Sequence, residues 1–326
     1  MAHDLVIGVD LGGTNVRSAV VGAGGVISHH AKLSVSGSKS ADEVIDHIVT
    51  CIGQTMASCG REEVRGVGVG TPGLIIEETG TIVYAPNVPG WTDLPLKSLL
   101  QQRLDLPVSI ENDANAAAIG EHWVGGGAGY KNLVCITLGT GVGGAIIMNN
   151  QVWRGSNGAG GEVGHTNVIE NGAQCGCGAP GCLEAYASAP AIARQAREAL
   201  QTGEESALLT MCHGNPENIT SAMVSRAAQE GDSVARTVMH RAGTLLGVAV
   251  ASLTNLLNPE IFVIGGGVIN AGDLIFDPIR HEIEKRAYKW SASILKVVPA
   301  QLGDDAGIIG AARYFVITEG DVRSMP

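Results

Sequence analysis

The sequence gathers four potential metal ligands in one short segment. One histidine and three cysteines lie within eighteen residues, at His165, Cys175, Cys177 and Cys182, and glycine is frequent around them. One imidazole and three thiolates form a common tetrahedral zinc set, and four protein ligands leave no coordination position open for catalysis. The spacing therefore predicts a structural Zn²⁺ ion. The alternative is a loop of unligated thiols, which would be prone to oxidation so close together.

A glycine-rich turn with a carboxylate at its start lies near the beginning of the chain. It directly follows the apolar run LVIGV and contains Asp10, Gly12, Gly13, Thr14 and Asn15. Backbone N–H groups and a hydroxyl in such a turn can hold phosphate oxygens. Asp10 could bind Mg²⁺ through water, since Mg²⁺ prefers carboxylate and water oxygens. Taken alone, the segment also fits a tight hairpin turn in which Asp10 only caps a bend.

Two more glycine turns follow apolar runs later in the chain. The second turn contains Thr137, Gly139, Thr140, Gly141 and Gly143. The third consists of Gly265, Gly266 and Gly267 and leaves room for a flat base or a ribose against the backbone. Neither of the first two turns matches the Walker pattern, and neither fits the dinucleotide fingerprint well. Two phosphate-type turns from two halves of the chain would instead hold a triphosphate from both sides.

Taken together, these motifs resemble a known fold family. DLGGTN, the TLGTGVGG loop and the VIGGG turn are similar to the two phosphate motifs and the adenosine motif of the actin/hexokinase/Hsp70 fold. The rest of the chain resembles the ROK family (repressors, open reading frames and kinases). NVPGW at residues 87–91, ENDANAAA at 111–118 and GEVGH at 161–165 look most like its bacterial glucokinases. The resemblance implies an α/β, two-domain actin-like ATPase (ribonuclease H-like) fold with a central cleft, and ATP-dependent phosphorylation of glucose at the 6-hydroxyl with Mg²⁺.

The resemblance also implies roles for several polar residues. Asp113 matches the family's catalytic base, although Asp113 alone would also be a good N-cap for the helix expected after it. Asn112 can donate to and accept from a sugar hydroxyl. Glu162, His165 and Glu184 match sugar-contacting residues of the family. If zinc takes one ring nitrogen of His165, the other is left to meet the sugar.

Four apolar runs that end in glycine-rich turns would position these motifs. They begin at Leu5, Val67, Leu133 and Ile261, and their composition predicts strands buried on both faces. Helical patterns cover residues 40–58, 114–123, 189–200 and 233–257, the last ended by Asn258-Pro259. This alternation predicts an α/β architecture with mostly parallel sheets.

Two similar strand–turn–strand units, at residues 5–21 and 133–148, indicate two related domains. A chain of 326 residues is long enough for both. We expect the N-terminal α/β domain to comprise residues 1–119 and 304–326, and the C-terminal α/β domain with the zinc loop to comprise 120–303. The last segment begins with Asp304 and Asp305, which are good N-cap residues, and its small residues suit a closely packed helix that returns to the first domain.

Composition limits the partners and the compartment. The formal net charge of −11 argues against non-specific binding of nucleic acid. No signal peptide precedes LVIGV, and polar residues interrupt the most apolar later stretch, so no membrane is expected as a partner. Seven cysteines without secretory features argue against a disulfide scaffold and favour a cytoplasmic protein. The resemblance suggests a homodimer or homotetramer.

The resemblance leaves alternatives open. ROK members include sugar-sensing transcriptional repressors with an added N-terminal helix-turn-helix segment, for which we expect no room before the DLGGTN turn at residue 10. Among the kinases, N-acetylmannosamine, N-acetylglucosamine, mannose, fructose and allose compete with glucose as the substrate. The phosphoryl donor, ATP or polyphosphate, is also open.

Overall fold

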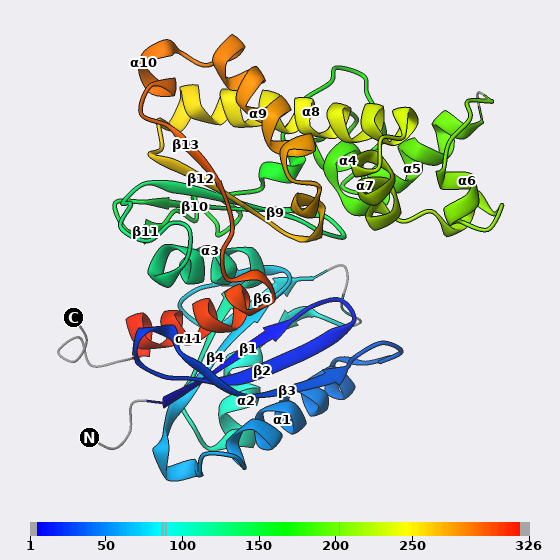
Figure 1. Ribbon diagram of the computed structural model, residues 1–326. Coiled ribbons are helices and arrows are strands. Elements are labelled where there is room, and N and C mark those ends of the chain that lie inside the picture. The colour runs from blue at the N-terminus through cyan, green and yellow to red at the C-terminus, as the bar shows by residue number, and fades with distance from the viewer. Residues whose placement is uncertain (1–4, 86–87, 89, 202, 320–326) are drawn as a thin grey trace. The chain divides into compact units, whose positions relative to one another are not determined.

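The computed structural model describes residues 5–85, 88, 90–201 and 203–319. The chain forms two compact units, and each unit is assembled from separate parts of the sequence (Figure 1). The first unit comprises residues 1–130, 150–160 and 301–326, and the second comprises 131–149 and 161–300. Two residues of the NVPGW segment, Asn87 and Pro89, lie outside the described residues.

A five-stranded sheet with the order β3-β2-β1-β4-β8 forms the centre of the first unit. Its strands are β1 (Leu5–Leu11), β2 (Asn15–Val21), β3 (Ile27–Ser34), β4 (Val64–Thr71) and β8 (Val108–Asn112). β1 and β2 form an antiparallel hairpin, whereas β4 pairs in parallel with both β1 and β8. The carboxyl ends of β1, β4 and β8 therefore meet at one edge of the sheet.

One face of this sheet is covered by helices α1 (Ala41–Met56) and α2 (Leu96–Leu104). Ile7 and Val9 of β1 and Val67 of β4 belong to the same buried cluster as the apolar residues of both helices. A three-stranded antiparallel sheet adjoins this part of the chain, with the order β5-β6-β7. Its strands are β5 (Leu74–Ile76), β6 (Thr81–Tyr84) and β7 (Thr92–Leu94).

The opposite face carries glycines where a strand would usually carry side chains. Helix α11 (Ala306–Glu319) lies directly on it and also packs on α3 (Asp113–Val124). A Cβ atom on Gly68 would lie 1.9 Å from the carbonyl oxygen of Ala311, and one on Gly310 would lie 1.6 Å from that of Ala116. Backbone thus meets backbone here, and the glycines at 68 and 310 allow this close packing of α11.

Replacing Gly68 with alanine is expected to destabilise the protein by roughly 1–3 kcal/mol or more, because the added methyl group collides with the backbone of α11. Gly53→Ala is the matched control. Gly53 lies in the exposed part of α1, and a Cβ there meets no atom within 4 Å. Alanine should be neutral there or stabilise the helix by up to about 1 kcal/mol. Thermal unfolding followed by circular dichroism measures both effects, and equal melting temperatures for the two variants would contradict this packing.

The second unit repeats the strand pattern of the first. Its sheet has the order β11-β10-β9-β12-β13, with the two-residue strand β11 at the edge. The strands are β9 (Leu133–Leu138), β10 (Val142–Met148), β11 (Gln151–Val152), β12 (Ile261–Gly265) and β13 (Lys296–Pro299). β9 and β10 form a hairpin, and β12 pairs in parallel with β9 and β13. If the five strands of each sheet are numbered 1 to 5 in the order of the chain, both sheets have the strand order 3-2-1-4-5. This confirms the predicted similarity of the two halves.

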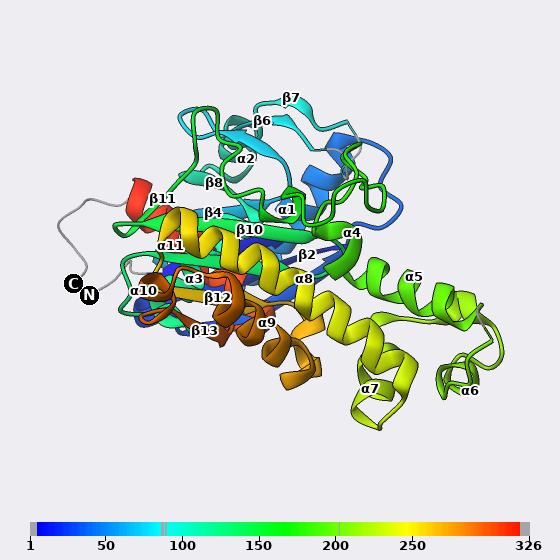
Figure 2. The same cartoon turned by 90° about the horizontal axis from the view of Figure 1, so that it is seen from above.

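Two long helices, α8 (Ser233–Leu257) and α9 (Asp273–Arg286), lie side by side and share a buried cluster with β9 and β12 (Figure 2). The shorter helices of this unit are α4 (Glu184–Ala187), α5 (Ala189–Leu200), α6 (Leu208–Met211), α7 (Ser221–Gln229) and α10 (Lys289–Ala292). Within the part of the chain that the structure describes, no helix has both the length and the apolar character needed to cross a bilayer.

The predicted helices agree with the structure to within two residues at each end. The closing helix packs in the first unit, as predicted. The compact units differ from the expected domain limits in three places, the smallest of which is that residues 301–303 lie with the first unit. Residues 120–130 lie with the first unit, because α3 continues to Val124, and residues 150–160 return to it from the second half of the chain.

Candidate functional site

The first phosphate-type turn is the exposed tip of the β1–β2 hairpin. The N–H of Gly12 donates to the carbonyl oxygen of Asn15 at 2.9 Å, and the side-chain amide of Asn15 donates to the hydroxyl of Thr14 at 2.8 Å. A Cβ atom on Gly13 would meet no atom within 4 Å. Packing therefore does not require glycine at position 13, and the open space beside it is available to a ligand.

Asp10 lies just before this turn and is paired with a cation. The guanidinium of Arg17 contacts its Oδ2 atom at 2.5 Å and also reaches Asp304 at 3.2 Å. The Asp10 side chain is 14% exposed, so solvent screens the first pair only partly. The Oδ2 atom of Asp10 is therefore already engaged by Arg17.

The second phosphate-type turn, between β9 and β10, is held by Glu184. The Oε2 atom of Glu184 accepts from the N–H of Val142 at 2.9 Å, and a Cβ atom on Gly141 would lie 2.5 Å from the same oxygen. The carbonyl oxygen of Gly139 accepts from the N–H of Ala189 at 2.8 Å. The turn is thus attached to the segment that starts α4 and α5, which the sequence did not predict.

The third glycine turn lies against the second one. Gly265 pairs with Thr137 in the parallel ladder of β12 and β9. Gly266 has a positive φ of 89°, and a Cβ atom there would lie 2.2 Å from the carbonyl oxygen of Leu138. Both the conformation and the space therefore require glycine at 266. Within the second unit, the proposed adenosine turn and one phosphate turn share one edge of the sheet.

The predicted zinc ligands converge in the second unit. One ligand atom from each of His165, Cys175, Cys177 and Cys182 can be chosen so that all lie within 4.8 Å of one another. The Nδ1 atom of His165 is 3.6 Å from Sγ of Cys175, and the Sγ atoms of Cys177 and Cys182 are 3.7 Å apart. Tetrahedral bonds of about 2.0–2.1 Å to nitrogen and 2.3 Å to sulfur imply separations of about 3.6 Å and 3.8 Å. The four residues therefore fit a Zn²⁺ ion.

The two ring nitrogens of His165 face different side chains. Nδ1 faces Cys175, whereas Nε2 lies 3.9 Å from the Oε2 atom of Glu162. The Glu162 side chain is 65% exposed. Gly164 lets this segment lie on β10, because a Cβ there would be 2.1 Å from the carbonyl oxygen of Val142. The Oε1 atom of Glu184 lies 3.6 Å from Sγ of Cys175, so both glutamates border the metal-ligand cluster.

Asn112 and Asp113 stand at the junction of β8 and α3. Asn112 is the N-cap of α3, since its Oδ1 accepts from the N–H groups of Ala114 and Asn115 at 3.0 and 3.2 Å. Its Nδ2 donates to the carbonyl oxygen of Gly73 at 3.2 Å. Asp113 is therefore the first residue inside the helix and not its cap. An amide has two N–H donors, so Asn112 retains one for a substrate.

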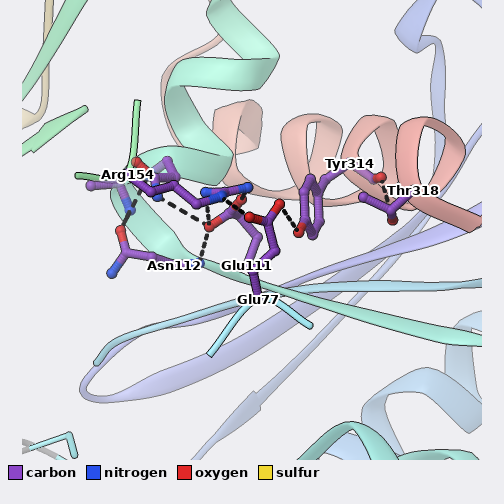
Figure 3. Close-up of polar contacts among 8 residues, drawn as sticks. Glu77, Glu111, Asn112, Arg154, Tyr314 and Thr318 are labelled. Carbon is purple, nitrogen blue, oxygen red and sulfur yellow. Dashed lines mark hydrogen bonds and ion pairs between the residues drawn. The ribbon is translucent and has the colours of Figure 1, made fainter. Parts of the chain in front are cut away.

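Next to this junction lies a partly buried ionic network that sequence reasoning missed (Figure 3). The guanidinium of Arg154 binds both carboxylate oxygens of Glu111, at 2.7 and 3.2 Å, and its Nε lies 2.7 Å from Glu77. Tyr314 of α11 donates its hydroxyl to Glu77 at 3.2 Å. The signal in the sequence was Glu111 itself, since a carboxylate at the end of an apolar strand needs a partner. Nothing in the sequence pointed to Arg154 as that partner.

The carboxylate of Glu111 is surrounded by hydrogen-bond donors. Burial raises the pKa of Glu111, and Arg154 and two N–H donors oppose this rise. All of these neighbours are donors, whereas a protonated carboxyl group would need an acceptor. For Arg154, burial acts to lower the pKa, but Glu111 and Glu77 outweigh it and the pKa is raised. Burial also raises the pKa of Tyr314, so its hydroxyl remains a donor.

The predicted residues divide between the two units. The first unit holds Asp10, Gly12, Gly13, Thr14, Asn15, Asn112 and Asp113. The second unit holds Thr137, Gly139, Thr140, Gly141, Gly143, Glu162, His165, Cys175, Cys177, Cys182, Glu184, Gly265, Gly266 and Gly267. Each unit thus combines a phosphate-type turn with polar residues suited to a sugar.

Comparison with known proteins gives consistent results. The ROK family matches residues 6–317. A glucokinase of Halalkalibacterium halodurans is 41% identical over 313 residues, which cover 95% of this chain and 94% of that protein. A ROK family glucokinase from Streptomyces griseus, solved in complex with glucose and AMPPNP, is 38% identical with a TM-score of 0.82, and the match covers 95% of this chain and 98% of that one. A ROK family transcriptional regulator has a TM-score of 0.85 at 30% identity, and the match covers 94% of this chain but 76% of that chain.

Proposed function

Because this chain belongs to the ROK family and has its two-domain actin-like fold, we propose that it is a glucokinase, which transfers the γ-phosphoryl group of ATP to the 6-hydroxyl of glucose. One observation carries this proposal. The chain is similar over nearly its whole length to a glucokinase that was solved with glucose and a nucleotide, and the match covers 98% of that protein. The transcriptional regulator that also matches is 30% identical, against 38% for this glucokinase, which favours the kinase.

Asp113 is the proposed catalytic base. Phosphoryl transfer passes through a loose transition state, so catalysis depends mainly on positioning and charge neutralisation. Asp113 accepts the proton of the sugar 6-hydroxyl and orients that oxygen toward the γ-phosphorus. Asn112 uses its remaining amide hydrogen for another sugar hydroxyl. The position of both residues where β8 becomes α3 supports this role, because strand and helix hold the backbone on both sides.

Glu162, His165 and Glu184 are the proposed sugar-binding residues of the second unit. A carboxylate can accept from two neighbouring hydroxyls, and the Nε2 atom of His165 is available beside Glu162. Cys175, Cys177 and Cys182 would hold Zn²⁺ with Nδ1 of His165. The ion would supply no chemistry to the reaction. It would fix the orientation of the imidazole.

The glycine turns are the proposed nucleotide site. The turn at residues 12–15 and the turn at 137–143 would bind phosphate oxygens through N–H and hydroxyl groups. Gly265, Gly266 and Gly267 would lie against the adenosine. Asp10 would meet Mg²⁺ through a bound water, and the metal would neutralise charge on the phosphates. Use of ATP supports a cytoplasmic location, and a homodimer or homotetramer is the assembly that we propose.

A substrate panel tests the proposed function. We expect glucose 6-phosphate from glucose and MgATP, with a higher kcat/KM than for N-acetylmannosamine, N-acetylglucosamine, mannose, fructose or allose. A coupled assay that reports ADP formation treats all sugars alike, and polyphosphate in place of ATP tests the donor. A higher kcat/KM for another hexose would overturn glucose as the substrate and leave the kinase intact. No phosphorylation of any sugar would contradict the proposed function.

A further inference from the structure

We propose that Arg154 is a positioning residue for the phosphoryl transfer, which holds the Glu111–Asp113 segment so that the Asp113 carboxylate points at the sugar hydroxyl. The inference rests on the proposed function and assigns a role to a residue outside the nucleotide, sugar and metal sites. Arg154 follows Glu111 by 43 positions in the sequence, and it lies in the segment 150–160 that returns to the first unit.

Arg154 and Glu111 form a bidentate ion pair. Nη2 lies 2.7 Å from Oε2 and Nη1 lies 3.2 Å from Oε1, so the pair is bidentate. The side chains of Glu111 and Arg154 are 4% and 18% exposed, so water screens the pair little. Only the planar guanidinium presents two parallel N–H donors in this way.

Glu111 in turn accepts hydrogen bonds from the residues around Asp113. Its Oε1 atom accepts from the backbone N–H of Asn112 at 2.8 Å and from Nδ2 of Asn115 at 3.1 Å. One carboxylate therefore ties the residue before Asp113 to the first turn of α3. Without Arg154, this buried carboxylate would lose its bidentate partner, so water or a proton would compete for its oxygens and its contacts with these donors would weaken.

The Nε side of the Arg154 guanidinium also has contacts. Glu77 accepts from Nε at 2.7 Å, and the ring of Tyr314 lies 5.5 Å from Cζ of Arg154 (Figure 3). Two carboxylates more than offset the single positive charge and occupy three of the five N–H donors. Such an arginine is poorly suited to bind a phosphate group of the substrate, and its contacts instead suit a support for the catalytic segment.

Residues 150–160 form a loop that folds back onto Arg154. The N–H of Gly160 donates to the carbonyl oxygen of Arg154 at 2.8 Å. A Cβ atom on Gly158 would lie 3.0 Å from the carbonyl oxygen of Ile75, so this loop packs beside β5. The chain then continues directly to Glu162. Arg154 therefore also stands at the base of the loop that leads into the proposed sugar-binding segment.

Arg154→Ala and Arg154→Lys test the proposal in the full-length enzyme. We expect kcat for glucose to fall by about tenfold or more in the alanine variant, and up to roughly 10²-fold, because small misplacements of a catalytic group have effects of this size. The KM for ATP should change little. Lysine keeps the charge but not the bidentate contact, so its kcat should lie between those of the alanine variant and the wild type. Arg103→Met, which removes the ion pairs of Arg103 with Asp42 and Asp46 between α2 and α1, is the control and should keep the wild-type kcat.

Chemical rescue separates positioning from folding. Added guanidinium ion should enter the space left between Glu111 and Glu77 and restore part of the kcat of Arg154→Ala, whereas sodium chloride at the same ionic strength should not. Asp113→Asn should not respond to guanidinium. An unchanged kcat per folded molecule in Arg154→Ala would overturn the proposal, and so would equal recovery with sodium chloride.

A crystal structure of Arg154→Ala distinguishes failure of this inference from failure of the proposed function. If the wild type phosphorylates no sugar, the kinase assignment fails on its own. The structure then decides the role of Arg154 without an assay. A displaced Asp113 carboxylate would support the positioning role, and an unmoved Glu111–Asp113 segment would overturn it.

Discussion

Asp113→Asn is expected to lower kcat for glucose phosphorylation by at least ~10²-fold, the usual effect of losing a positioned general base. Glucose binding and the melting temperature should stay close to wild type. Asn112 caps α3, so the substitution removes no cap. The Oδ1 atom of Asp113 accepts from the N–H of Ala114 at 2.9 Å, and an asparagine oxygen can accept the same bond. The substitution removes the proton-accepting carboxylate.

Steady-state kinetics and glucose calorimetry measure this result. Asp42→Asn is a matched control, because Asp42 is also in the first turn of a helix and its side chain is 82% exposed. Losing a negative charge near a helix N-terminus costs about 0.3–1 kcal/mol at an exposed site, so both variants should lose similar, small amounts of stability. A near-wild-type kcat in Asp113→Asn would leave Asp113 as an ordinary first-turn residue.

Cys177→Ala is expected to give a soluble protein without zinc and with a glucose KM raised about 10- to 100-fold, which corresponds to losing one or two hydrogen bonds to charged groups. Each unit has its own apolar cluster, so folding should not depend on the metal. Without the ion, the imidazole of His165 is free to turn away from Glu162, and the segment with both sugar-binding glutamates loses its restraint.

For Cys177→Ala, the structure changes the expected affinity for MgATP. The phosphate turns lie far from the cysteines in the sequence, and this separation predicts an unchanged affinity for MgATP. Glu184, however, has one carboxylate oxygen 3.6 Å from Cys175 and the other on the N–H of Val142 in the second phosphate turn. We therefore expect a smaller but measurable rise in the KM for MgATP.

Elemental analysis for zinc and calorimetry with glucose and nucleotide test these outcomes. Cys59→Ala is the control, because Cys59 lies outside the cluster and should leave zinc content and both affinities unchanged. Zinc-free wild-type protein with full glucose affinity would contradict the link between metal and sugar. Equal loss of both affinities would mean that the metal supports the whole second unit.

Local patterns in the sequence predicted most of the fold, and they also supplied the residues proposed for the site. Helix α8 was predicted with its observed limits, because its apolar periodicity ends at Asn258-Pro259. The proposed zinc ligands and the glycine turns are contiguous motifs, so their chemistry could be proposed without the fold. The junction at Asn112 shows the limit, since either Asn112 or Asp113 could cap a helix and only the placement of one side-chain oxygen decides between them.

Contacts between distant segments could not be predicted. Glu77, Glu111, Arg154 and Tyr314 come from four separate parts of the chain, and only tertiary folding brings their charges together. The return of residues 150–160 to the first unit has the same origin, because the hydrophobic pattern of this segment is too short to assign it to either unit. The hydrogen bond from Val142 to Glu184 likewise joins positions 42 residues apart.

The place of α11 in the first unit has a consequence for how the protein is made. The ribosome synthesises β1, β4 and α3 early, but α11 follows every element of the second unit. Until α11 emerges, the glycine-lined face of the first sheet lacks the helix that packs on β1, β2, β4 and β8, and apolar side chains there stay open to water or to chaperones. Domains usually fold in the order of synthesis. Here the second unit can complete its core before the first, so the half of the protein that is translated first is the half that finishes folding last.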